Sequence, residues 1–208
     1  MRFLFLTVLT FFCFSEASAQ FDFNLKCTIK SNRINPKDNL IRESSNIYYN
    51  SENPDIYIVE KKGFYRLFHN GTKEIYQFLK SNVNGKSVLA TAGIEAMRLD
   101  YSEFEIKRVS VEKISNNKFL VKSFSNIKTK RSNLEVVFTL KKSPNPMTRV
   151  RFLDLSPTIH QKIYDELLVN LDNPNYQWEK AEVDYKNGYK FIYEVSNCQS
   201  TNMRLRFE

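Results

Sequence analysis

The sequence predicts a mainly β protein, an antiparallel meander that forms a curved sheet, half-barrel or barrel, with one α-helix in its C-terminal half. Short runs of alternating apolar and polar residues predict the strands, and Asn-Gly or Asn-Asn pairs between runs predict hairpins. One later stretch has helical spacing instead. Glycine and proline are scarce, with 5 and 6 residues among 208, which argues against a disordered or collagen-like chain. We expect about nine to eleven strands joined by sequential hairpins.

Residues 1–19 have the composition of a cleaved export signal. One basic residue precedes an apolar run from Phe3 to Phe14, and Ala17-Ser18-Ala19 is the small-residue pattern at which signal peptidases cleave. The run is shorter than the roughly 20 residues of a membrane-spanning helix, and the large aromatic residues before Cys13 disfavour a lipoprotein signal. We therefore expect export to the periplasm or the extracellular space. Residues 20–208 are expected to form a single β-rich domain without a later transmembrane segment.

Two cysteines remain after removal of such a signal, Cys27 and Cys198, near opposite ends of the mature chain. An exported protein meets conditions that permit disulfides, so we predict a bond between them rather than two buried free thiols. The bond would tie the first strand to the last ones, as in a closed or nearly closed sheet. Two cysteines and two distant histidines offer no metal-ligand spacing, so neither a metal nor a cofactor is expected.

The most aromatic stretch, Phe64 to Phe78, predicts a hairpin around Asn70-Gly71, a pair that favours a type I′ turn with positive φ at both residues. Large apolar side chains fall on both faces of its strands, and the preceding run 56–59 shows the same pattern. A strand with only one buried face alternates more cleanly. We therefore expect a core on one side of these strands and a second cover on the other: the helix, a bound apolar ligand or a partner protein.

The later runs are easier to interpret. Leu134 to Leu140 has the clearest alternation, and two further runs follow at 189–195 and 203–207. The stretch Ser87 to Met97 fits either a strand or a second short helix. Apolar residues at Ile159, Ile163, Leu167 and Leu171 predict a helix over about 157–171.

The ends of that helix also have sequence signals. Ser156 is a plausible N-cap, Pro157 suits the first helical position, and Asn173-Pro174 ends the pattern. His160 is expected on the helix surface.

Positive charge concentrates in one segment. The chain has a net charge of +8, and twelve basic but only three acidic residues lie between Glu105 and Arg151. If their strands pair, a stripe of cations would attract a lipid head group or acidic polysaccharide; nucleic acid is not expected as a partner of an exported chain. The alternative is a charged face that only keeps the protein soluble and protects its edges. The candidate anion-contacting residues are Lys107, Lys122, Lys141, Arg149 and Arg151.

The pattern favours an exported, non-enzymatic binding protein for a lipid-like or amphiphilic anionic ligand. Neither a Gly-x-Ser-x-Gly elbow nor a zinc-protease His-Glu pattern occurs. The order of signal, meander and single helix is similar to that of periplasmic lipid carriers and lipocalin-like folds, in architecture alone. The alternatives are an envelope or extracellular protein-interaction module using the doubly apolar hairpin, and a hydrolase built from distant carboxylates and His160. The candidate ligand-lining residues are Phe64, Phe68, Tyr76, Phe78 and Trp178.

Overall fold

The computed structural model describes residues 20–34, 40–53, 55–83, 86–97, 106–144, 157–173 and 175–206. These residues form eleven strands and one helix. The first six strands are β1 (Gln20–Ile34), β2 (Leu40–Tyr49), β3 (Ile56–Lys61), β4 (Phe64–His69), β5 (Glu74–Val83) and β6 (Lys86–Ala96). The remaining elements are β7 (Arg108–Ser115), β8 (Lys118–Phe124), β9 (Leu134–Lys142), α1 (Pro157–Val169), β10 (Tyr176–Asp184) and β11 (Lys190–Arg206).

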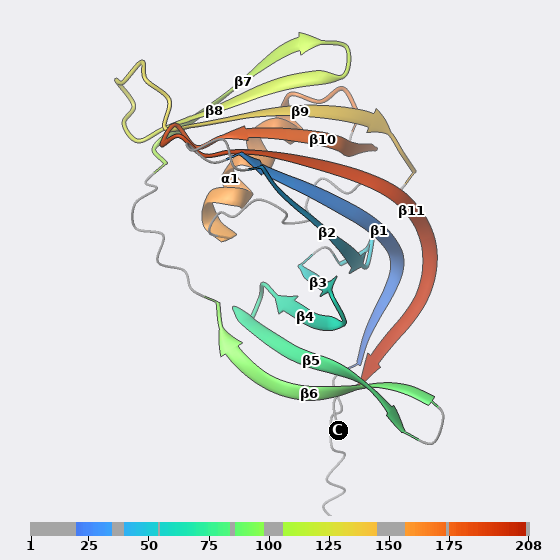
Figure 1. The fold of residues 1–208 in the computed structure, drawn as a ribbon. Coiled ribbons are helices and arrows are strands. Elements are labelled where there is room, and N and C mark those ends of the chain that lie inside the picture. Colours follow the sequence, from blue (N-terminus) through green and yellow to red (C-terminus); the bar gives the residue numbers. More distant parts are fainter. Residues whose placement is uncertain are drawn as a thin grey trace, which may run out of the picture.

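All the strands belong to one antiparallel sheet that curves around α1 (Figure 1). Its order is β6-β5-β4-β3-β2-β1-β11-β10-β9-β8-β7, so the first and last strands pair in the middle. The two edges are β6 and β7, which are consecutive in the chain. Such a meander would close into a barrel if these edges paired; instead the sheet stays open between them. The predicted fold class is confirmed, as a curved half-barrel.

The predicted disulfide is also confirmed. Cys27 and Cys198 are bonded, with an S–S distance of 2.05 Å, and they link β1 to β11 across the centre of the sheet. The β1–β11 register shifts between Phe23 and Leu25 and again between Lys26 and Thr28. Such bulges bend the strands that contain them. The bond therefore joins the N-terminal half, β1 to β6, to the C-terminal half at a bend.

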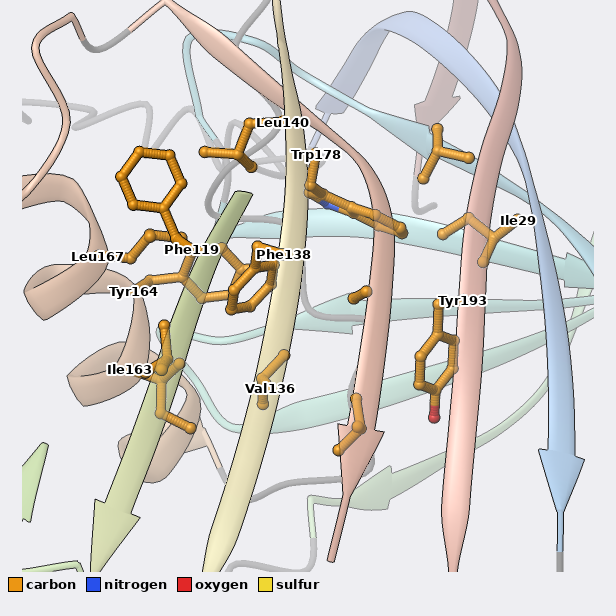
Figure 2. Close-up of a cluster of buried hydrophobic side chains, with 14 of the residues drawn as sticks. Ile29, Phe119, Val136, Phe138, Leu140, Ile163, Tyr164, Leu167, Trp178 and Tyr193 are labelled. Atoms are coloured by element: carbon orange, nitrogen blue, oxygen red, sulfur yellow. The ribbon is translucent and has the colours of Figure 1, made fainter. Parts of the chain in front are cut away.

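The larger core lies on the inner side of the sheet, between the strands and α1. Ile163, Tyr164 and Leu167 of the helix point toward Val136 and Phe138 of β9, with Trp178 of β10 nearby (Figure 2). Residues of β1, β2 and β3 belong to the same cluster, so both halves of the sheet contribute to it. Burial of these apolar side chains is what fixes the helix inside the curve.

A second core lies on the opposite, outer face of the N-terminal strands. Ile58, Leu67 and Phe78 are buried there, together with Phe23 from the start of β1 and Leu205 from the end of β11. The bent ends of β1 and β11 thus cover the outer face of β3 to β5. The two-sided apolar pattern of these strands is explained by a second cover that belongs to the chain itself and is not the helix.

Two local expectations are corrected, and one open alternative is decided. Neither Asn70 nor Gly71 has positive φ; their connection spans four residues, in which Lys73 (φ 61°) is left-handed and its N–H donates to the His69 carbonyl at 2.9 Å. The two-residue turn with positive φ at both positions is Lys62-Gly63, at 52° and 80°. A Lys-Gly pair is a weaker turn signal than Asn-Gly, although glycine takes the second of the two positive φ angles at no steric cost.

Of the two alternatives for the stretch 87–97, the strand is the one that forms, as β6 up to Ala96. The second correction concerns His160, which is buried at 2% exposure instead of lying on the helix surface. It stands one turn before the buried Tyr164, and their rings are 4.6 Å apart. The i, i+4 relation of these two residues places both on the helix face that meets the sheet.

Candidate functional site

The open side of the half-barrel, between β6 and β7, exposes the inner face of the N-terminal strands. Cross-strand pairing sets the rows of side chains on this face. Phe68 pairs with Ile75, Arg66 with Gln77, and Phe64 with Leu79, because β4 and β5 are in direct register. We call the inner side chains of these three rows, with Tyr57 and Val59 of β3, the inner strip.

Exposure increases along the inner strip away from the core. Tyr57 is buried at 4% and stacks on half-buried Phe68, with ring centroids 4.9 Å apart and planes inclined by 6°. At the other end, Phe64 is 61% exposed and Leu79 is 44% exposed. These two apolar side chains are direct cross-strand neighbours, so they form one patch rather than two isolated exposures.

A single arginine lies in the middle of the inner strip. Arg66 is exposed and shares the face of Phe64 and Phe68. No ion pair joins it to another side chain in the described part of the protein. The neighbouring Lys61, by contrast, is bound to Glu43 at 2.7 Å. The strip therefore combines exposed apolar surface with an available guanidinium, the group that pairs best with carboxylate or phosphate.

A groove of about 420 Å³ lies on the other side of the opening, between the start of β7 and α1. Lys162 of the helix donates from Nζ to the Ile106 carbonyl at 3.2 Å, so a hydrogen bond joins the two sides of the groove. Arg108 is held by the ring of Phe124, 3.6 Å from its guanidinium carbon, and donates to the Thr129 carbonyl. The groove is lined by Ile106, Lys107, Arg108, Val109, Lys162, Asp165 and Glu166.

The predicted basic stripe is only partly located. Lys107 lies in the groove, whereas Lys122 is on β8 and approaches Glu112 at 3.9 Å. Lys141 is exposed near the end of β9. It does not lie beside Lys122, because Lys122 pairs with Glu135, six residues before Lys141 on that strand. Arg149 and Arg151 lie outside the described residues. The described cations are therefore distributed over separate places and not gathered in one row.

The five predicted ligand-lining residues do not lie together but in three different places. Phe64 and Phe68 belong to the inner strip. Tyr76 and Phe78 face the outer core, where the Tyr76 hydroxyl donates to Glu74 Oε2 at 2.7 Å and Phe78 is buried. Trp178 is fully buried in the larger core (Figure 2). The alternation Phe64, Arg66, Phe68 already contained the signal for Arg66, and pairing across the turn identifies Leu79.

The outer face of the same strands holds a hydrogen-bonded carboxylate. Glu60 accepts from the Tyr48 hydroxyl at 2.7 Å, the Tyr65 hydroxyl at 3.0 Å and Asn46 Nδ2 at 3.1 Å. Burial alone would raise the pKa of Glu60, but these three donors, with the charge of Lys26, outweigh it and lower the pKa. Burial first, and then the bond to Glu60, raises the pKa of Tyr65 to about 12.

Other kinds of site find less support in the described residues. No group of three or more His, Cys, Asp or Glu side chains is placed there to hold a metal ion. His160 packs in the core beside Tyr164, whereas Asp165 and Glu166 are exposed. Among other carboxylates that a hydrolase could use, Asp100 and Asp154 lie outside the described residues, and Asp184 is bound to Lys186 and Lys190. Within these ranges, none of the helical segments has the length and apolar character needed to cross a membrane.

Comparisons with known proteins give structural similarity only. No protein-family model and no curated protein matches the chain. A LolA superfamily protein from Nitrosomonas europaea is similar with a TM-score of 0.36 and 8% identity, covering 87% of each chain. A domain from Vibrio parahaemolyticus, named for outer membrane lipoprotein sorting, gives 0.32 and 9%, covering 86% of each chain. A DUF1329 family protein from Desulfovibrio piger gives 0.27 and 7%, covering 89% of this chain and 87% of that one.

Proposed function

We propose that this chain is an exported, non-enzymatic binding protein for an amphiphilic ligand with an anionic head group. The ligand would lie on the inner strip, at the opening between β6 and β7. The observation that carries the proposal is the exposed pair Phe64 and Leu79, at 61% and 44%, on the inner face beside Arg66. These residues are covered neither by the larger core nor by the second core.

The physical argument starts from the exposed apolar surface. Removing apolar area from water is favourable by roughly 25 cal/mol per Å², so a hydrocarbon chain lying along the strip gains free energy from Phe64, Leu79 and the half-buried Phe68. Such a chain would continue the inner face of the core, which already ends in the Tyr57–Phe68 stack. Of the predicted lining residues, Phe64 and Phe68 therefore remain in the proposal.

The head group is assigned by charge. A guanidinium binds a carboxylate or a phosphate through two parallel hydrogen bonds, and Arg66 lies between the two phenylalanines on one face of β4. Lys107, in the groove on the other side of the opening, supplies a second cation. An amphiphile with an acidic head can contact the apolar side chains of the strip and also pair with Arg66, whereas a neutral hydrocarbon can contact only the apolar side chains.

Binding of cis-parinaric acid, a fluorescent long-chain carboxylic acid, tests the proposal in solution. The wild-type protein is expected to bind it, and Arg66→Glu to weaken binding at least about tenfold, because a carboxylate then faces a carboxylate. Arg131→Glu is the matched control, since Arg131 is an exposed arginine in the loop before β9, away from the strip. Thermal unfolding of each variant reports whether the fold is intact.

Two results would count against the proposal. One is the absence of probe binding by the wild-type protein, together with no amphiphile in a solvent extract of the purified chain. The other is an equal loss of binding in both arginine variants. Sedimentation that depends on protein concentration, without probe binding, would favour the protein-interaction alternative, in which the same exposed row contacts another protein.

A further inference from the structure

The β3–β4 turn and the adjoining ends of β5 and β6 place apolar and basic side chains at one end of the sheet. We call residues 61–64, 79–82 and 88 the hairpin tips. From them we propose a second function: the hairpin tips dock the protein on the surface of a bilayer that contains anionic phospholipid. This inference does not depend on the ligand proposed above.

The register places the apolar side chains of the hairpin tips in one patch. Phe64 pairs with Leu79, and Leu79 pairs in turn with Ala90 on the edge strand β6. Val88 follows on the same face of β6, opposite Ser81, and is 39% exposed. Figure 1 shows the β5–β6 hairpin extending beyond the body of the sheet. Leu79 and Val88 are therefore exposed on this hairpin, and Phe64 is exposed beside them on β4.

The charges of the hairpin tips have one sign. Lys61, Lys62 and Lys80 lie among these residues, and no acidic residue does. Lys61 is paired with Glu43 of β2, whereas Lys62 and Lys80 are exposed. Cationic side chains close to a membrane are attracted by the negative surface potential of anionic lipids, and this attraction falls within a Debye length.

A membrane surface fits this combination of side chains. Apolar side chains insert at the boundary between head groups and acyl chains, while lysines reach the phosphates from the same element. The β7–β8 hairpin provides the contrast within the same protein. Ile114 is 52% exposed there, but Glu112 lies among its lysines and the segment offers a single large apolar side chain. The two exposed hairpins thus differ in what membrane docking needs: several exposed apolar side chains together with charges of one sign.

Tryptophan substitution gives a direct test, because the only native tryptophan, Trp178, is fully buried. In Phe64→Trp, vesicles with about a third phosphatidylglycerol in phosphatidylcholine should shift the emission to the blue, and brominated phospholipid should quench it. Ile114→Trp is the matched control and should show neither change. Equal quenching at both positions, or none at Phe64→Trp, would overturn the proposal.

Charge reversal tests the electrostatic part by vesicle flotation. Lys62→Glu combined with Lys80→Glu should lower binding to the same vesicles at least about tenfold, and Lys62→Arg with Lys80→Arg should preserve it. Lys113→Glu combined with Lys118→Glu, on the β7–β8 hairpin, is the control. Binding of the wild-type protein to pure phosphatidylcholine at equal strength would contradict the choice of anionic lipid, as would an equal loss in the control.

The two proposals fail separately. Lys62 lies in a turn and Lys80 on the face opposite Leu79, so the double reversal should leave cis-parinaric acid binding in solution unchanged. A protein that floats with vesicles but binds no probe would retain docking and lose the ligand proposal. A protein that binds the probe but does not float would retain the ligand proposal and overturn docking.

Discussion

Glu60 shows how individual side chains fix the outer face of the N-terminal strands. Its carboxylate connects β3 to Asn46 and Tyr48 of β2 and to Tyr65 of β4 by side-chain hydrogen bonds. Thr28 of β1 extends the chain of bonds by donating to Asn46 Oδ1 at 3.1 Å. Four neighbouring strands are thus linked through one carboxylate, and the network is charged only while Glu60 is ionised.

This arrangement predicts that Glu60→Gln destabilises the protein in a pH-dependent way. The lowered pKa means that ionised Glu60 stabilises the fold above the pKa of a free carboxyl, and that this contribution is lost as the pH falls through the folded-state value. We expect a loss of about 1–2 kcal/mol in the free energy of unfolding at pH 7, shrinking below about pH 4. Urea unfolding of the wild-type protein and the variant, at pH 7 and below about pH 4, measures this difference in the free energy of unfolding. Glu179→Gln, at an exposed position on β10, is the control; a loss that does not change with pH would contradict the assignment.

At the level of the element, the hairpins show which turn signals are decisive. Asn70-Gly71 has the stronger sequence signature, yet its connection spans four residues. Within it the Asn70 N–H donates to the Asp55 carbonyl at 2.9 Å, and His69 Nδ1 accepts from the Thr72 N–H at 3.1 Å. Lys62-Gly63 has the weaker signature and forms the tight turn, because β3 and β4 are in direct register from Ile56 with His69 to Lys61 with Phe64. The register leaves only two residues for the connection.

Two glycines make this argument testable. Gly63 has φ +80°, and a Cβ added there meets nothing within 4 Å, so the cost of Gly63→Ala is conformational and is expected to be about 1 kcal/mol. Gly93 in β6 has equal space but no positive φ, so Gly93→Ala should be neutral or stabilising by about 0.5 kcal/mol. Thermal unfolding of both variants measures the difference, and equal effects would contradict the turn assignment.

At the level of the whole molecule, the fold class, the cystine and the helix follow from local patterns. Leu134 to Leu140 alternates because β9 has one buried face, and Ile159, Ile163 and Leu167 repeat at helical spacing because one side of α1 meets the sheet. The second core could not be predicted from the alternation or helical spacing of a single segment. It depends on bulges near Phe23 and Lys26, which turn the ends of β1 and β11 over the outer face, and no single-strand pattern contains that bend.

The same long-range contacts decide which aromatic residues remain available. Phe78 and Trp178 have the composition expected of a ligand surface, but packing from distant strands buries them at 2% and 0% exposure. Phe64 is left exposed because it is the first residue of β4, beyond both cores. Composition identifies candidates, whereas the bend and the helix position determine which of them reach the opening.

The disulfide tests whether the two halves of the sheet act as one unit. The Cys27–Cys198 bond closes a separation of 171 residues, for which chain entropy gives about 5 kcal/mol, and measured disulfides contribute about 2–5 kcal/mol. Cys27→Ala combined with Cys198→Ala should therefore lower the free energy of unfolding by about that range. Guanidinium unfolding measures the loss, and wild-type protein refolded in the presence of reductant controls for the change in side-chain volume.

The shared core predicts that the weakened protein still unfolds in one step. The larger core takes Ile47 and Tyr57 from the N-terminal half and Val136, Ile163 and Trp178 from the C-terminal half, so neither half keeps its core without the other. Trp178 fluorescence reports the C-terminal half, and far-ultraviolet circular dichroism reports the whole sheet. Coincident transitions are expected in the double variant. Separate transitions would mean that the covalent link, and not the common core, holds β1 to β6 against the rest of the half-barrel.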